Sequence, residues 1–218
     1  MIKAVFFDCD GVLIDSERVH QRYNVQFARE NGLTLEPEDF YPFIGVTTRS
    51  DIWNGIYAKA GSPWSQEEFT RRFRAFKAQR IEGLHFGTIL FPDIPAVLEE
   101  LKERDLIIAC ASSSSMKYLE KVMDQCRIGQ WFDLLVTGRD FKESKPAPDI
   151  YLHCAKVFGL DPEECLVIED SPYGIRAGRA AGMEVLARRD TTFGMDQSEA
   201  TALFDDARDI LTYLERNR

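Results

Sequence analysis

Short runs of continuously apolar residues, separated by helical patterns, most constrain how this chain can fold. Unbroken apolar runs are typical of strands that are covered on both faces, which is the situation in a parallel sheet. We expect strands at 3–8, 106–111, 134–138, 165–168 and 183–187. Between them, apolar residues recur at helical spacing, as at Ile94, Val97, Leu98 and Leu101. This alternation predicts an α/β fold with a Rossmann-like, doubly wound parallel sheet.

The stretch 16–87 interrupts this rhythm because it contains no convincing strand. One helix is expected at 16–30, and another begins at the capping-box pattern Ser65–Glu68. A crossover between neighbouring strands normally needs far fewer residues than this. We therefore expect a sheet domain formed by 1–15 and 88–218, with an inserted all-helical cap domain at 16–87.

The composition excludes several classes of protein. With 27 Lys and Arg against 36 Asp and Glu, the formal charge is −9 and the pI is about 5.0, which argues against a dedicated nucleic-acid binder. No apolar run approaches the roughly 20 residues of a membrane span, and no secretion signal is evident, so a cytoplasmic protein is expected. The 5 cysteines form no CxxC pair, and no histidine stands at zinc-ligand spacing from them. Reduced, buried thiols and no zinc site are expected.

Polar side chains follow the predicted strands at the edge where an open parallel sheet binds its ligands. They are Asp8, Asp10, Ser112, Lys145, Glu169 and Asp170. Each residue alone has an ordinary explanation, such as a turn hydroxyl, a surface charge or a helix cap. These ordinary explanations do not account for all six residues following predicted strands at the same edge. Their joint placement therefore predicts a ligand-binding site.

Clustered carboxylates need a cation, and oxygen ligands with room for a phosphate group suit Mg²⁺. Asp8 and Asp170 are the expected side-chain ligands. Lys145 and the hydroxyl of Ser112 could then hold the remaining phosphoryl oxygens, as a phosphoryl-transfer transition state requires. These six residues at the edge of the sheet, which we call the rim, therefore predict phosphoryl-transfer chemistry with Mg²⁺ as the cofactor.

These motifs resemble those of the haloacid dehalogenase superfamily of phosphotransferases. They are Asp8–Val12 followed by Asp15-Ser16, the strand-terminal Ser112, Ser144–Asp149, and Ile168–Ser171 with Gly174. The similarity runs from residue 3 to about residue 190, with the motifs in the family's order. The helical insert is similar to the small cap of the β-phosphoglucomutase-like and sugar-phosphate phosphatase branch.

The resemblance implies a role for each carboxylate of the rim. Asp8 would be the nucleophile that forms an aspartyl-phosphate. Asp10 would act as general acid and then as general base, and its backbone carbonyl would reach the metal. Asp170 would bind Mg²⁺ together with Asp8, and Glu169 would support the metal directly or through a neighbouring ligand.

The resemblance also implies that Ser112 and Lys145 bind the transferring phosphoryl group, and that Ser113 contacts the substrate. In the cap, His20 of the first helix and Lys77 of a cationic helix are candidates for substrate binding. An ordinary solvated helix face remains an equal alternative for Lys77.

Arg49 is a candidate for holding a distal anionic group of the substrate. It ends the run 45–49, which is one residue longer than the similar run of the mutase. One extra residue rotates a helical side chain by about 100°. This departure weakens a role in gripping a bisphosphate and favours a phosphatase.

We therefore expect a Mg²⁺-dependent phosphatase that hydrolyses a small phosphorylated metabolite, with a sugar phosphate as the expected substrate. The alternative is a β-phosphoglucomutase, which transfers the phosphoryl group to a second sugar hydroxyl instead of water. A non-catalytic phosphate-sensing or partner-binding protein is less favoured, because every catalytic position holds a competent residue. The expected partner is the small-molecule substrate, with no nucleic acid and no membrane, and a monomer is expected.

Overall fold

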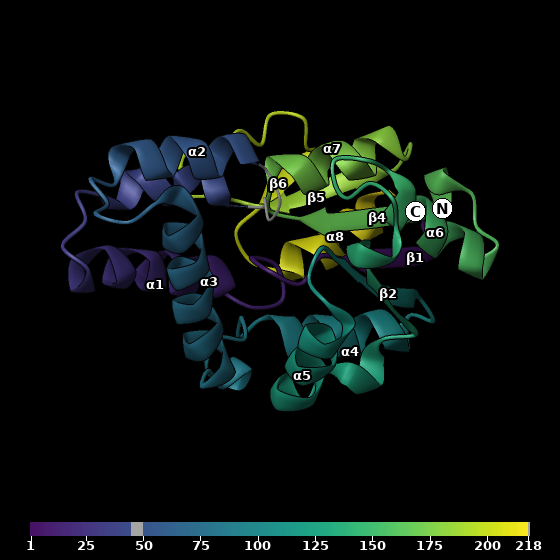
Figure 1. The fold of residues 1–218 in the computed structure, drawn as a ribbon. Coiled ribbons are helices and arrows are strands. Elements are labelled where there is room, and N and C mark those ends of the chain that lie inside the picture. The colour runs from purple at the N-terminus through teal and green to yellow at the C-terminus, as the bar shows by residue number, and fades with distance from the viewer. Residues whose placement is uncertain (45–49, 218) are drawn as a thin grey trace. The chain divides into compact units, whose positions relative to one another are not determined.

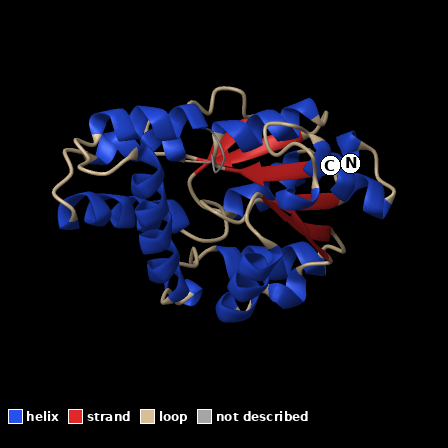
Figure 2. Ribbon diagram, in the orientation of Figure 1, coloured by secondary structure: helices blue, strands red, loops and turns tan. Residues whose placement is uncertain are grey.

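The computed structural model describes residues 1–44 and 50–217. Six strands form one parallel sheet in the order β3-β2-β1-β4-β5-β6 (Figures 1 and 2). They are β1 (Ala4–Phe7), β2 (Ile107–Ser112), β3 (Leu134–Thr137), β4 (Cys165–Glu169), β5 (Glu184–Arg188) and β6 (Ala202–Phe204). The predicted doubly wound α/β sheet is confirmed. The pattern did not indicate β6, because this edge strand has only 3 residues and one of them, Leu203, is exposed.

Helices cover both faces of this sheet. Figure 1 shows α6 and α7 on one face and α4 with α5 on the other. Over all the described residues, in both parts of the chain, the α-helices are α1 (Ser16–Glu30), α2 (Ser50–Lys59), α3 (Gln66–Glu82), α4 (Ile94–Glu103), α5 (Met116–Cys126), α6 (Asp149–Phe158), α7 (Pro172–Ala180) and α8 (Arg208–Arg216). No helix in the described ranges is both long and apolar enough to cross a membrane.

The double coverage explains the unbroken apolar runs of the sequence. Successive side chains of a strand point to opposite faces of the sheet. On one face, Ala4 and Phe6 of β1 belong to a buried cluster with Tyr151 of α6 and Ile175 of α7. All of β1 is buried, so neither face carries polar residues. The cysteines are likewise buried and free, as predicted.

The chain divides into two compact units, Met1–Asp15 with Phe86–Arg218, and Ser16–His85. The second unit contains α1, α2 and α3 around an aromatic core, in which the rings of Phe27 and Phe73 lie edge to face with centroids 5.0 Å apart. Ser65 caps α3 by accepting a hydrogen bond from the backbone of Glu68 at 3.3 Å. The helical character expected of this segment thus rests on helix capping and aromatic packing.

Candidate active site

The pairing of β1 with its neighbours brings carboxylates into one row. Phe7 pairs with Ile168 of β4, so the next residue of each strand places Asp8 beside Glu169. On its other side β1 pairs with β2 in the same way, which brings Ala111 to the level of Asp8. This row lies at the carboxyl ends of the central strands, where the sequence predicts the site.

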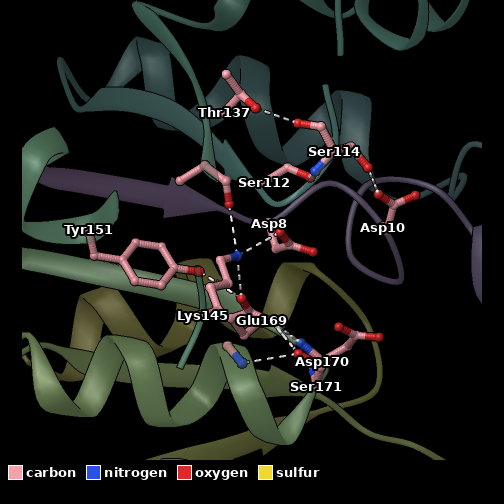
Figure 3. A network of polar contacts seen from close by, with 12 residues as sticks. Asp8, Asp10, Ser112, Ser114, Thr137, Lys145, Tyr151, Glu169, Asp170 and Ser171 are labelled. Carbon is pink, nitrogen blue, oxygen red and sulfur yellow. Dashed lines mark hydrogen bonds and ion pairs between the residues drawn. The ribbon is translucent and has the colours of Figure 1, made fainter. Parts of the chain in front are cut away.

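Lys145 joins the three members of this row. Its Nζ donates to Asp8 Oδ1 at 2.7 Å, to Glu169 Oε1 at 2.7 Å and to the carbonyl oxygen of Ala111 at 2.9 Å (Figure 3). The side chain is only 5% exposed. An ammonium group has three protons to donate, so these contacts use its full capacity. The loop after β3 therefore delivers a buried cation to the carboxylates of β1 and β4.

Both oxygens of the fully buried Glu169 are held by the protein. Oε1 accepts a second hydrogen bond from the hydroxyl of Tyr151 at 2.7 Å. Oε2 accepts from the backbone N–H groups of Asp170 and Ser171 at 3.1 and 3.4 Å, and from the Ser171 hydroxyl at 3.3 Å. Five hydrogen bonds from four residues thus hold Glu169, which favours a supporting role beside the metal over a role as its main ligand.

Two glycines make room for these carboxylates. A Cβ at Gly174, in the first turn of α7, would lie 1.7 Å from Glu169 Oε1. A Cβ at Gly11 would lie 1.9 Å from Asp170 Oδ2, and Gly11 also has a φ of +78°. That conformation favours glycine. Gly11 and Gly174, which belong to the motifs that resemble the family, are therefore required at this site because a larger residue would overlap the carboxylates.

Asp10 lies on the other side of the row, beside the loop that follows β2. Its Oδ2 accepts from the Ser114 hydroxyl at 2.9 Å (Figure 3). Its Oδ1 accepts from the Tyr118 hydroxyl at 2.7 Å. Thr137 at the end of β3 anchors this loop, since its hydroxyl donates to the Ser114 carbonyl at 2.6 Å. The two hydroxyl groups hold the carboxylate in a defined orientation.

The serines after β2 have separate tasks. Ser112 is buried, and its hydroxyl oxygen accepts from the backbone of Ser114 at 3.1 Å. Ser113 is half-buried on the same turn. Ser115 caps α5 by accepting from the backbone of Tyr118 at 3.4 Å. The structure places Ser112 and Ser113 on the site loop, and their contacts with a substrate stay a prediction.

Burial dominates the electrostatics of this cluster. It raises the pKa of Asp8 to about 7; the neighbouring Glu169 and Asp10 act in the same direction, while Lys145 opposes them. For Lys145, burial alone would lower the pKa, but the Asp8 and Glu169 carboxylates outweigh it and hold the pKa well above its usual value. Burial and the adjacent Glu169 raise the pKa of Tyr151 well above its ordinary value, so Tyr151 keeps the proton that it donates.

The carboxylates fit a hard divalent cation. One oxygen from each of Asp8, Glu169 and Asp170 lies within 4.8 Å of the others. Carboxylate oxygens are the ligands that Mg²⁺ prefers. Since Glu169 is saturated with hydrogen bonds, Asp8 and Asp170 are the residues best suited to hold the ion.

The predicted cap residues lie in the helical unit, apart from Arg49, which is outside the described residues. His20 is on α1 and Lys77 is on α3, with its Nζ 5.7 Å from the ring centroid of Phe73. On the same helix, Arg72 binds Glu68 at 2.6 Å, so part of the cationic stretch serves the helix itself. A role of the cap residues in substrate binding stays a prediction.

Sequence reasoning missed three hydroxyl groups of the site, those of Tyr151, Ser114 and Tyr118. Tyr151 has the spacing of a core residue of α6. Its hydroxyl group is the signal from which the contact could have been predicted, because a buried tyrosine hydroxyl usually has a hydrogen-bond partner. Ser114 and Tyr118 contact Asp10 across more than 100 residues of sequence. No local pattern reveals such contacts.

Comparisons with known proteins show the family to which the chain belongs. Residues 2–182 match the family model of the haloacid dehalogenase-like hydrolases. Hexitol phosphatase B of Escherichia coli (strain K12) is 30% identical over 223 residues, covering 96% of this chain and 97% of that protein. The SUPPRESSOR OF QUENCHING 1 protein of Arabidopsis thaliana is 31% identical over 191 residues, which are 87% of this chain but only 18% of that much longer protein.

A solved structure from Thermotoga maritima, assigned as a β-phosphoglucomutase, superposes with a TM-score of 0.75 at 26% identity and covers 99% of both chains. Relatives named as phosphatases support the prediction of a phosphatase enzyme. The family match spans most of the chain and includes every residue of the carboxylate row and its lysine. The chain therefore belongs to the haloacid dehalogenase-like hydrolases, as its motifs predict.

Proposed function

We propose that this chain is a Mg²⁺-dependent phosphatase that releases inorganic phosphate from a small phosphorylated sugar or sugar alcohol through an aspartyl-phosphate on Asp8. The observation that carries the proposal is the buried Lys145, which lies 2.7 Å from both Asp8 and Glu169. A cation in this position neutralises the nucleophile's surroundings and can stabilise charge that develops on a phosphoryl group. The similarity to hexitol phosphatase B supports the substrate class.

The residues of the rim divide the chemistry between them. A carboxylate oxygen of Asp8 bonds to phosphorus as the bond to the substrate oxygen breaks, and Asp10 gives that leaving oxygen a proton. Asp10 then takes a proton from water as the water oxygen attacks phosphorus, which frees Asp8 and inorganic phosphate. The hydroxyl of Ser112 donates to a phosphoryl oxygen, and Lys145, whose three protons are donated within the site, stabilises the phosphoryl oxygens by its charge. Mg²⁺ held by Asp8 and Asp170 supplies further positive charge to the phosphoryl group when bound.

Substrate recognition is assigned to the helical unit as part of this proposal, with His20, Lys77 and Arg49 as the candidate contacts. The loop residue Ser113 would contact the substrate from the sheet unit. A cytoplasmic location and a monomeric state also stay predictions, as does a small-molecule substrate as the sole partner.

A phosphate-release screen with Mg²⁺ over phosphorylated sugars, sugar alcohols and bisphosphates tests the function. Wild-type protein should release phosphate from at least one substrate, and Asp8→Asn should reduce the rate by roughly a thousandfold or more, since it removes the nucleophile. Asp124→Asn on the exposed face of α5 is the matched control and should keep the wild-type rate. If no substrate of the panel yields phosphate, the phosphatase assignment is wrong.

The second candidate is a β-phosphoglucomutase, which the similarity to the Thermotoga maritima structure supports. Both reactions share the first half, and they differ in whether water or a sugar hydroxyl accepts the phosphoryl group. With β-glucose 1-phosphate as substrate, inorganic phosphate and isomerised sugar phosphate are measured in the same sample. A phosphatase yields mainly phosphate, and predominant isomerisation would favour the mutase.

A further inference from the structure

Tyr151 joins the core of the sheet unit to the site. It lies in α6. Cys154 and Ala155 of the same helix belong to the apolar cluster between the sheet and helices α6 and α7. Tyr151 is itself fully buried, yet its hydroxyl donates to Glu169 Oε1 at 2.7 Å. The Nζ of Lys145 lies 4.9 Å from the centroid of its ring (Figure 3). One side chain thus contacts both partners of the buried ion pair.

These contacts bear on where the ammonium group of Lys145 lies. Glu169 Oε1 accepts from both Lys145 and Tyr151, so the tyrosine hydroxyl takes part of the negative charge that would otherwise attract the lysine alone. The ring of Tyr151 adds a cation–π contact within the usual distance of about 6 Å. The carboxylate itself cannot move far, because Gly174 packs against it without room for a methyl group. Glu169 is therefore the fixed member of the group, and the position of the ammonium group of Lys145 depends on the balance between its acceptors.

We propose that Tyr151 is a positioning residue of the phosphoryl-transfer reaction, which holds Lys145 beside Asp8 by sharing Glu169 with it and by contacting the ammonium group with its ring. This inference rests on the proposed function of Asp8 and Lys145. It assigns Tyr151 no contact with the substrate. Without the hydroxyl, Glu169 Oε1 draws the ammonium group toward itself and away from the phosphoryl group on Asp8.

Tyr151→Phe tests the proposal, because it keeps the ring and removes only the hydroxyl. We expect kcat to fall roughly tenfold while KM changes by less than about twofold, since the lost hydrogen bond joins Tyr151 to the charged Glu169 and makes no contact with the substrate. Tyr213→Phe is the matched control. Its hydroxyl also bonds a glutamate, Glu184, but at the opposite end of the strands, so kcat should stay at the wild-type value.

A double-mutant cycle shows whether Tyr151 acts through Lys145. In a Lys145→Met background, Tyr151→Phe should change kcat by less than about twofold, because the group that it positions is gone. An equal loss in both backgrounds would overturn the proposal, and so would a wild-type kcat for Tyr151→Phe.

The same cycle is measured by urea unfolding, where Tyr151→Phe and Lys145→Met should be non-additive and Tyr213→Phe with Lys145→Met should be additive. This second readout needs no turnover. A protein that releases no phosphate would contradict the proposed function, whereas additive unfolding energies for the first pair would contradict the positioning role of Tyr151. The two failures are therefore distinguishable.

Discussion

The ammonium group of Lys145 faces two buried carboxylates, and a third, that of Asp170, lies within reach of the same cluster. Buried carboxylates are costly unless their charge is compensated. The raised pKa of Asp8 expresses this cost, because burial and its acidic neighbours favour the protonated form. If catalysis needs Asp8 ionised, the folded state is less stable when no metal is bound.

The Asp8→Asn variant should therefore be more stable than the wild type without Mg²⁺ at pH 8. The folded-state pKa of Asp8 is about 7 against a usual value of 3.8, so between these values the folded protein binds more protons than the unfolded one. Stability of the wild type is then lost as the pH rises through this window. Asparagine has no proton to lose, so the variant lacks this part of the slope. Urea unfolding from pH 4 to pH 8 measures the difference; parallel pH profiles would contradict it.

Lys145→Met should have the opposite effect on stability. It leaves the Asp8 and Glu169 carboxylates buried without their cation, and removal of one partner of a buried pair costs roughly 3–5 kcal/mol. The phosphatase rate should fall at least about a hundredfold, because a group that stabilises the transition state is lost. Lys142→Met, on the exposed part of the same loop, controls for the change of residue type. Equal unfolding energies for the two variants would refute the ion-pair account.

At the scale of secondary-structure elements, α7 and β4 are fitted to each other by Gly174. The first turn of α7 passes so close to Glu169 that an added methyl group would overlap its carboxylate. Ser171 strengthens this junction, because it caps α7 by accepting from the backbone of Gly174 and also donates to Glu169. The helix start thus positions the carboxylate that holds Lys145.

Gly174→Ala should destabilise the protein by about 1–3 kcal/mol and lower the phosphatase rate, because overpacking displaces Glu169. The control is Gly55→Ala in α2, where an added Cβ meets no atom within 4 Å. There the same substitution should stabilise by about 0.5–1 kcal/mol, since alanine is the better helix former. Thermal unfolding and phosphate release are measured for both variants, and a stable, fully active Gly174→Ala protein would contradict the close fit.

Elements covered on both sides could be predicted from sequence, and contacts between distant elements could not. β1 and β4 leave unbroken apolar runs because helices bury both faces, and the residues after them meet because parallel strands end at one edge. Tyr151 shows the limit. Its spacing on α6 gives it the pattern of a core residue, and only the placement of α6 against β4 shows that its hydroxyl reaches Glu169.

At the scale of the whole molecule, the carboxylates proposed to hold the metal and their lysine all belong to the unit formed by Met1–Asp15 and Phe86–Arg218. The helical unit Ser16–His85 interrupts the sequence of that unit after the loop that carries Asp8 and Asp10. Ligands that bind the site are therefore expected to stabilise the sheet unit by mass action.

Mg²⁺ should raise the unfolding temperature of the wild type, and a chelator should reverse the rise and stop phosphate release. A metal present at about 100 times its Kd contributes about 2.7 kcal/mol. Asp170→Asn removes one of the two best-placed ligands and should abolish most of this shift, whereas Asp124→Asn should keep it. Turnover that continues unchanged in the chelator would exclude Mg²⁺ from the mechanism.

The central position of β1 has a consequence for biosynthesis. Ala4 pairs with Ile107 on one side and with Cys165 on the other, so both neighbours of this apolar strand are synthesised at least about 100 residues later. At roughly 5–20 residues per second, the strand emerges from the ribosome many seconds before it can be paired. During that interval its four apolar residues are flanked by the charges of Lys3 and Asp8. Charged residues beside an unpaired strand oppose aggregation, so we expect Asp8, the proposed nucleophile, also to protect the nascent chain.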